Sequence, residues 1–150
     1  MEYISHSPRE TEEFAARFAR LLQPGDVVAF RGSLGAGKTA FVRGMASALV
    51  PDAEVSSPTF ALVNEYDGTL PLWHFDMYRI TSVEDVDSTG FYDYLDMGGV
   101  LAVEWSENIE AALPDSSIFV SLEPVPGGAA TDRRFTISGK EAARFEASLL

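Results

Sequence analysis

The sequence contains no cysteine and only two histidines, His6 and His74. The lack of cysteine excludes disulfides and thiolate chemistry, and two histidines are too few ligands for a structural zinc site. No apolar run approaches the roughly 20 residues that a membrane-spanning helix requires. The first residues also lack the basic and apolar regions of a secretory signal. We therefore expect a cytoplasmic protein with a single domain over residues 1–150, an ordinary length for one domain.

Positive charge is scarce in the middle of the chain. Residues 44–132 carry sixteen acidic side chains but one basic side chain, Arg79, and the net charge of the whole chain is −12. A surface this acidic repels a phosphate backbone, so we expect no strong direct binding to nucleic acid. The acidity could suit a basic protein partner, or it could simply keep the protein soluble.

A phosphate-binding pattern is the most informative feature that is present. Gly32–Thr39 reads Gly-Ser-Leu-Gly-Ala-Gly-Lys-Thr and fits G-x-x-x-x-G-K-[ST] at every fixed position. The apolar Val27–Phe30 before it predicts a strand, and Ala40–Leu49 after it predicts a helix. Backbone N–H groups and the helix dipole make such a strand–turn–helix an anion site. An ordinary glycine-rich turn is the alternative interpretation.

This pattern assigns roles to its residues. Lys38 is predicted to reach the β- and γ-phosphates of a nucleoside triphosphate as a catalytic residue, and the Thr39 hydroxyl to bind Mg²⁺. The predicted nucleotide-binding residues of the loop are Ser33, Leu34, Gly35, Ala36, Gly37, Lys38, Thr39 and Ala40.

Hydrolysis also needs a carboxylate for Mg²⁺ and a group that places the attacking water. Glu104 follows the apolar run Val100–Val103, at the position where α/β sheets present groups to a ligand. Asp76 lies in a predicted strand, Leu70–Ile80, where two-residue alternation puts it on the same face as His74. Glu104 and Asp76 are the predicted catalytic and metal-binding carboxylates, with solvent-facing side chains as the alternative.

Three further residues carry weaker signals. Thr59, in Ser57–Phe60, offers a second hydroxyl to Mg²⁺ or phosphate, although the segment also reads as a simple proline turn into a strand. Trp105 could stack on a base or belong to the core. Arg79 could contact phosphate or pair with Asp76.

The predicted elements alternate between helices and strands. Ser7 is the expected N-cap of the first helix, with Pro8 at its first position and Glu10 closing a capping box. The order mixes β–α–β units with a hairpin, which predicts an α/β domain of the P-loop NTPase type with a mixed, mostly parallel sheet flanked by helices. Further elements are expected as strands at 1–5, 59–66, 118–122 and 134–138, and as helices at 82–87, 90–96, 106–113 and 140–150.

Five segments together resemble one family. They are Gly32–Thr39, Ser57–Phe60, Asn64–Tyr66, His74–Arg79 and Val103–Trp105. In this order and spacing they resemble the bacterial TsaE (YjeE) family, from about Ser7 to Trp105 and more loosely beyond. The phosphate loop is shared by many families, whereas the last two segments are much more specific.

The resemblance implies a small ATPase that is needed for threonylcarbamoyladenosine synthesis on tRNA. In that family the protein binds a TsaD–TsaB heterodimer, and its ATP hydrolysis supports multiple turnover there. The matching motifs imply phosphate binding by Lys38, Mg²⁺ binding by Thr39, and essential roles for Glu104 and Asp76. Thr11 matches a threonine near the nucleotide.

Ser33 departs from the family pattern, which usually has Asp at this place. The position is variable in the general phosphate loop, so we expect phosphate binding to persist. A partner-facing role of that Asp is not carried over to Ser33.

Three other functions are weighed against this one. A small-molecule kinase usually clamps phosphates with several arginines, and residues 44–132 hold Arg79 alone. A GTPase normally carries Asn-Lys-x-Asp, and Asn64–Asp67 has the spacing without the lysine. A nucleotide-gated binding module with negligible catalysis stays open. Few cations near the site predict slow hydrolysis that a partner stimulates, for example with an arginine in trans.

Overall fold

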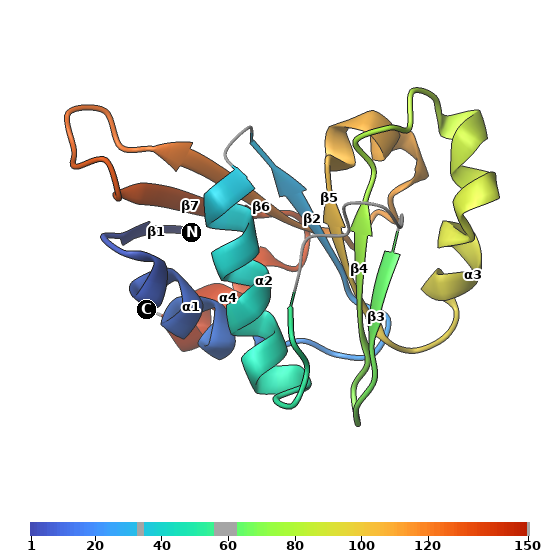
Figure 1. The fold of residues 1–150 in the computed structure, drawn as a ribbon, viewed down its shortest axis with the longest axis horizontal. Helices are drawn as coiled ribbons and strands as arrows, with labels where there is room; N and C mark the ends of the chain where they lie inside the picture. The colour runs from blue at the N-terminus through green and yellow to red at the C-terminus, as the bar shows by residue number, and fades with distance from the viewer. Residues whose placement is uncertain (33–34, 56–62, 150) are drawn as a thin grey trace.

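Seven strands form one central sheet in the order β1-β7-β6-β2-β5-β4-β3 (Figure 1). The structure is a computed structural model that describes residues 1–32, 35–55 and 63–149, and the backbone alone at residues 35 and 36. The strands are β1 (Glu2–Ser5), β2 (Val27–Arg31), β3 (Val63–Tyr66), β4 (Leu72–Asp76), β5 (Val100–Glu104), β6 (Ile118–Pro124) and β7 (Arg133–Ser138).

The sheet is mixed, with most strands running in one direction. β2 pairs in parallel with both β5 and β6, and β4 pairs in parallel with β5. β3 and β7 run antiparallel to their neighbours, so five of the seven strands share one direction. This confirms the predicted α/β fold with a mostly parallel central sheet.

Helices cover both faces of the sheet. α1 (Pro8–Ala19), α2 (Gly35–Leu49) and α4 (Ala142–Leu149) lie on one face (Figure 1). Aromatic rings from the three helices pack against one another there. The ring centroid of Phe18 on α1 lies 4.6 Å from that of Phe145 on α4 and 5.3 Å from that of Phe41 on α2. The other face buries Phe75 and its neighbours beneath η1 (Val83–Thr89), α3 (Phe91–Leu95) and η2 (Ser106–Ala112).

Burial on both faces explains the apolar strands at the centre of the sheet. Val28 and Ala102 belong to the core under α2, whereas Val27 and Leu101 belong to the opposite core. All five residues of β5 are buried, and the last of them is Glu104. A strand enclosed on both sides reads as a continuous apolar run, and for this reason the sequence predicts β2 and β5 well.

The start of α1 agrees with the prediction from the sequence except for one hydrogen bond. Ser7 is the N-cap, its Oγ accepts the Glu10 N–H at 3.1 Å, and Pro8 occupies the first helical position. The expected capping box was wrong in one detail, because the Glu10 carboxylate accepts the N–H of His6 at 2.8 Å instead of that of Ser7. The carboxylate therefore binds one residue before the N-cap.

Several element ends differ from the predicted ones. β4 ends at Asp76 and not at Ile80, because Asp76 Oδ1 accepts the Tyr78 N–H at 2.9 Å and turns the chain. The short helices at 83–89 and 106–112 are 3₁₀ helices. Part of the strand expected at 59–66 lies outside the described residues. Among the described helices, none is long and apolar enough to cross a membrane.

Candidate functional site

β2 ends at Arg31, directly before the glycine-rich segment that begins at Gly32. Gly32 has φ +113°, and a Cβ on it would lie 2.4 Å from the carbonyl oxygen of Leu122 on β6. Glycine is therefore required here both by the backbone angle and by the close approach of the neighbouring strand. Ser33 and Leu34 lie outside the described residues, and α2 begins at Gly35. The predicted strand and helix are thus observed on the two sides of the glycine-rich segment.

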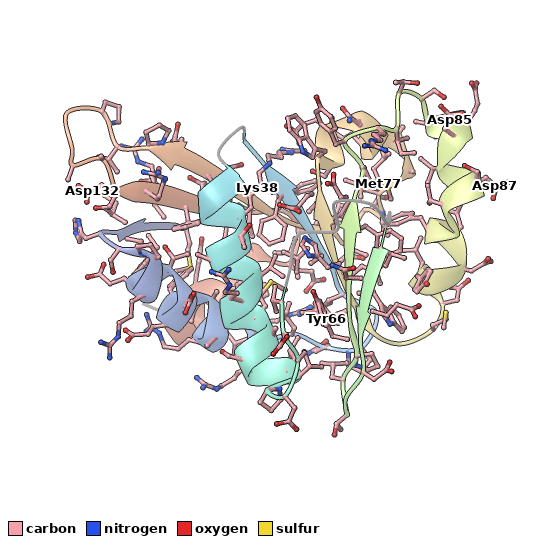
Figure 2. All side chains as sticks on the ribbon, in the orientation of Figure 1. Lys38, Tyr66, Met77, Asp85, Asp87 and Asp132 are labelled. Atoms are coloured by element: carbon pink, nitrogen blue, oxygen red, sulfur yellow. The ribbon has the colours of Figure 1, made fainter. Side chains whose placement is uncertain are left out.

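Lys38 is buried in the first turns of α2, at the upper end of that helix in Figure 2. Its side chain is 2% exposed, and Nζ lies 4.8 Å from the ring centroid of Trp105. An ammonium over an indole face is held by the ring quadrupole, and the attraction grows as water is excluded. This contact ties the start of α2 to the residue that follows β5.

The two predicted carboxylates end neighbouring parallel strands. Asp76 on β4 and Glu104 on β5 are register partners. Alternation along β5 places Glu104 on the same face as Ala102, which packs in the core under α2. The contact of Lys38 with Trp105, the next residue, brings the start of α2 to this end of β5. Lys38, Asp76 and Glu104 thus lie toward the same end of the sheet.

Glu104 is buried and hydrogen-bonded to a histidine that the sequence left without a role. Its side chain is 10% exposed, and its Oε2 lies 2.9 Å from Nε2 of His74. Burying a carboxylate without a partner would be costly, and the imidazole supplies one. The only signal in the sequence was that His74 precedes Asp76 by two residues on one strand face.

The turn after β4 is held in place around Asp76. Besides the Asp76 contact with the Tyr78 N–H, Nδ2 of Asn108 donates to the Met77 carbonyl oxygen at 2.9 Å. Tyr78 is 61% exposed and packs on Trp105 with centroids 4.9 Å apart. Asp76 is half-buried, so its carboxylate remains open to water.

A cavity of about 220 Å³ borders the start of α2. Thr11 from α1 contributes to its wall, and the Thr11 hydroxyl donates to Ser5 Oγ at 2.7 Å. Trp105 is not among the lining residues and lies instead against Lys38. The cavity is lined by Ser7, Pro8, Thr11, Gly37, Ala40, Thr131 and Arg133. It therefore joins the predicted Thr11 with two residues of the phosphate loop.

An ion pair joins two segments that border this cavity. His6 Nδ1 lies 2.9 Å from Asp132 Oδ1, which links the chain before α1 to the connection between β6 and β7. The hydrogen bond and the negative charge of Asp132 raise the pKa of His6. The same hydrogen bond lowers the pKa of Asp132.

The remaining predicted residues are Thr39, Thr59, Arg79, Gly35 and Ala36. Thr39 is half-buried on α2 next to Lys38, whereas Thr59 falls outside the described residues. Arg79 is exposed, and within the described residues it forms no ion pair with Asp76 or with any other carboxylate. Gly35 and Ala36 form the first turn of α2.

No ready-made metal cage exists in the described part of the chain. It holds no group of three or more histidine or carboxylate side chains that could bind a metal ion. Mg²⁺ commonly binds with nucleotide through one or two carboxylates plus phosphate oxygens and water. The pairing of Asp76 with Glu104 beside a phosphate-loop helix fits such binding.

These features define an α/β protein in which two carboxylates, Asp76 and Glu104, end neighbouring parallel strands. The buried Lys38 of the phosphate-loop pattern lies near the same end of the sheet, against Trp105. Residues 5–132 match the family described as "Threonylcarbamoyl adenosine biosynthesis protein TsaE". The chain belongs to the TsaE family, which takes part in the biosynthesis of threonylcarbamoyladenosine in tRNA.

Individual relatives match over most of their length. The chain is 37% identical to a tRNA threonylcarbamoyladenosine biosynthesis protein TsaE from Treponema pallidum, over 92% of this chain and all of the relative. It is 40% identical to the Bacillus subtilis TsaE over 82% of this chain and 77% of that protein. The crystal structure of Bacillus subtilis YdiB superposes with a TM-score of 0.74 at 29% identity, covering 97% and 95% of the two chains.

Proposed function

We propose that this protein binds ATP with Mg²⁺, hydrolyses it slowly alone, and supports threonylcarbamoyladenosine modification of tRNA by acting on a TsaD–TsaB complex. The observation that carries the proposal is that Asp76 and Glu104 are register partners at the ends of neighbouring strands, and that Lys38 packs on Trp105, the residue after Glu104. Membership of the TsaE family supports the place of the protein in this modification.

The cavity beside α2 is the proposed nucleoside site. It adjoins Gly37 and Ala40, so a nucleoside bound there has its phosphates next to the first N–H groups of α2. Lys38 extends to the Trp105 side of the same helix end, where the terminal phosphates would lie. Thr11 and the loop residues therefore hold the nucleoside end, and Lys38 holds the phosphate end.

The carboxylates and Thr39 would hold Mg²⁺ on the phosphate side. When bound, Mg²⁺ neutralises the charge on the phosphate oxygens. One oxygen of Glu104 is bonded to His74, which leaves the other for the metal or the attacking water. Asp76 is half-buried and can contact the same water from the neighbouring strand.

Slow hydrolysis follows from the cations that surround the site. Arg31 at the end of β2 is already paired with Glu110, and Arg79 is exposed after β4. Arg133 lines the cavity, but its Nη1 donates to the carbonyl oxygens of Ala130 and Asp132. Lys38 is thus the cation best placed to stabilise the charge that develops on the phosphates. An arginine supplied by a partner raises comparable rates by about 10³–10⁵. The TsaD–TsaB complex is the proposed source of this stimulation.

The decisive experiment compares Mg-ATP turnover with and without purified TsaD–TsaB. Glu104→Ala should retain nucleotide binding. Its stimulated rate should be about 10²–10⁴-fold lower, because the group that positions the water or the metal is removed. Lys38→Ala should lose tight Mg-ATP binding in calorimetry. Glu2→Ala removes an exposed carboxylate at the start of β1, the end of that strand away from the cavity, and should behave as wild type.

Each part of the proposal has its own contrary result. A measurable rate that TsaD–TsaB leaves unchanged would exclude stimulation. A Lys38→Ala variant that binds Mg-ATP as tightly as wild type would exclude the loop as the nucleotide site. Nucleotide-dependent binding to TsaD–TsaB without any turnover would instead favour a nucleotide-gated binding module. Equal affinities for GTP and ATP would contradict the proposed preference for ATP.

A further inference from the structure

His74 is buried in β4 beside the candidate site. Its side chain is 2% exposed, and Nε2 lies 2.9 Å from Oε2 of Glu104. An ionised carboxylate oxygen can only accept a hydrogen bond, so Nε2 carries the proton and donates it. The imidazole is therefore a buried donor aimed at one oxygen of the candidate catalytic carboxylate.

The two ring nitrogens of His74 differ in their surroundings. Nδ1 is buried and has no hydrogen-bond partner in the described part of the chain. In the neutral ring with the proton on Nε2, only a lone pair is left unpaired at Nδ1. The hydrogen bond to Glu104 thus assigns a proton to Nε2 of His74.

The neighbouring strand leaves space for this contact. The register partner of His74 on β5 is Ala102, two residues before Glu104 on the same face. Side chains at directly opposite positions of adjacent strands lie next to each other. The small methyl group of Ala102 therefore leaves room for the imidazole of His74. The imidazole can therefore extend along β5 to the carboxylate of Glu104.

We propose that His74 is a positioning residue for Glu104. By binding Oε2, it holds the carboxylate in one orientation and leaves Oε1 for Mg²⁺ or the attacking water. Oε1 has no hydrogen-bond partner among the described residues. Groups that orient a ligating carboxylate typically contribute 10–100-fold to metal affinity or activity. The inference rests on the proposed ATPase function, which the loop, Asp76 and Glu104 support without His74.

The hydrogen bond itself can be tested without nucleotide or metal. Long-range ¹H–¹⁵N spectra of the wild-type protein at one fixed pH should show a proton on Nε2 of His74. His6→Gln removes the only other histidine and so assigns the signals. Glu104→Ala should shift the Nε2 resonance. A ring without a proton on Nε2, or a signal unaffected by Glu104→Ala, would overturn the proposal.

The positioning role is tested with Mn²⁺ as the probe, because its binding to the ATP-loaded protein is read directly by electron paramagnetic resonance. His74→Phe keeps a planar ring and removes the donor, whereas His74→Gln supplies an amide N–H near the place of Nε2. We expect His74→Phe to weaken Mn²⁺ binding and lower kcat by about tenfold or more. ATP affinity without metal should stay near wild type, and His74→Gln should restore most of the loss.

The outcomes separate a positioning role from a merely structural one. Wild-type Mn²⁺ affinity in folded His74→Phe would overturn the proposal. Equal losses in both variants, with equally lowered melting temperatures, would also overturn it, because the donor would then be irrelevant. If the wild-type protein itself fails to bind Mn²⁺ with ATP, the proposed function fails, and the tautomer spectra still report whether His74 holds Glu104.

Discussion

Trp105 has a left-handed backbone conformation, and its ring contacts the ammonium group of Lys38. Its φ is +57°, and it is the only non-glycine residue with positive φ among the described residues. A bulky side chain in this left-handed region costs about 1–2 kcal/mol. The ring packs between Lys38 Nζ and the exposed Tyr78. The strained backbone therefore turns the indole toward the lysine that the phosphates of a nucleotide would attract.

Mg-ATP binding should change the fluorescence of Trp105. When phosphates attract the Lys38 ammonium, the charge 4.8 Å from the indole centroid moves, and the emission responds to it. Trp105→Phe should abolish the change in a fluorescence titration. Trp73→Phe is the matched control, because Trp73 is buried near the start of β4 against Tyr94, away from the strand end that Trp105 follows, and its loss should leave the change intact. The reverse pattern would contradict this assignment.

At the scale of elements, the close contact of α1 with α2 depends on one glycine. A Cβ on Gly44 would lie 2.3 Å from the Glu12 carbonyl oxygen and 2.6 Å from Cβ of Ala15. These atoms belong to the backbone and to a side chain of α1 that cannot rotate away. The two helices can approach this closely only because residue 44 has no side chain.

Gly44→Ala should destabilise the protein although alanine is the better helix former. The gain in helix propensity is about 1 kcal/mol, whereas overpacking typically costs about 1–3 kcal/mol and here requires the helices to separate. We expect a net loss of up to about 2 kcal/mol in denaturant unfolding. Ser47→Ala, on the exposed side of α2, is the control and should be close to neutral. Increased stability of Gly44→Ala would show that the helices can adjust.

The His6–Asp132 pair should stabilise the protein only in a window of pH. The raised pKa of His6 gives a contribution that is full below the ordinary value of 6.5 and is lost as the pH rises through the higher folded value. The lowered pKa of Asp132 gives a contribution that is present above the ordinary value of 3.8 and is lost as the pH falls through the lower folded value. The two contributions overlap between these ordinary values.

His6→Gln should therefore lower the melting temperature slightly near about pH 5.5 and leave it unchanged near about pH 8. Asp132→Asn should show the same pattern, and the double variant should add no further loss near pH 5.5 if the pair acts as one unit. A melting temperature that falls equally at both pH values would contradict an electrostatic contribution.

At the scale of the whole molecule, negative charge dominates. The net charge of −12 arises mainly from residues 44–132, which contain one cation. Long-range repulsion between like charges acts on every phosphate of an approaching nucleic acid. A role in tRNA modification is therefore compatible with this surface when another protein contacts the tRNA.

The protein alone should not bind tRNA in a saturable way. Fluorescence anisotropy at about 0.15 M salt, where charges are screened beyond roughly 8 Å, should show no specific complex. Association with TsaD–TsaB, if it uses the acidic surface, should weaken as salt increases. Tight tRNA binding by the isolated protein would show that a local basic site overrides the net charge.

Much of the fold follows from local patterns. Ser7 and Pro8 mark the start of α1, and the apolar runs before Gly32 and Glu104 mark β2 and β5. The end of β4 was predicted less well, because the turn depends on the Asp76 carboxylate and on Asn108, 32 positions further along the chain. Contacts between distant residues leave little trace in periodicity.

By itself, the sequence predicted the kind of chemistry and the end of the sheet at which to look. The phosphate-loop pattern, an apolar strand ending in Glu104 and the aspartate of β4 are local features, and local physics specifies them. The tertiary structure alone decided the pairings. His74 meets Glu104, Lys38 meets Trp105, and Thr11 lines one cavity with Gly37 of α2. Strand register and helix packing bring together these residues, which lie 26 to 67 positions apart in the sequence.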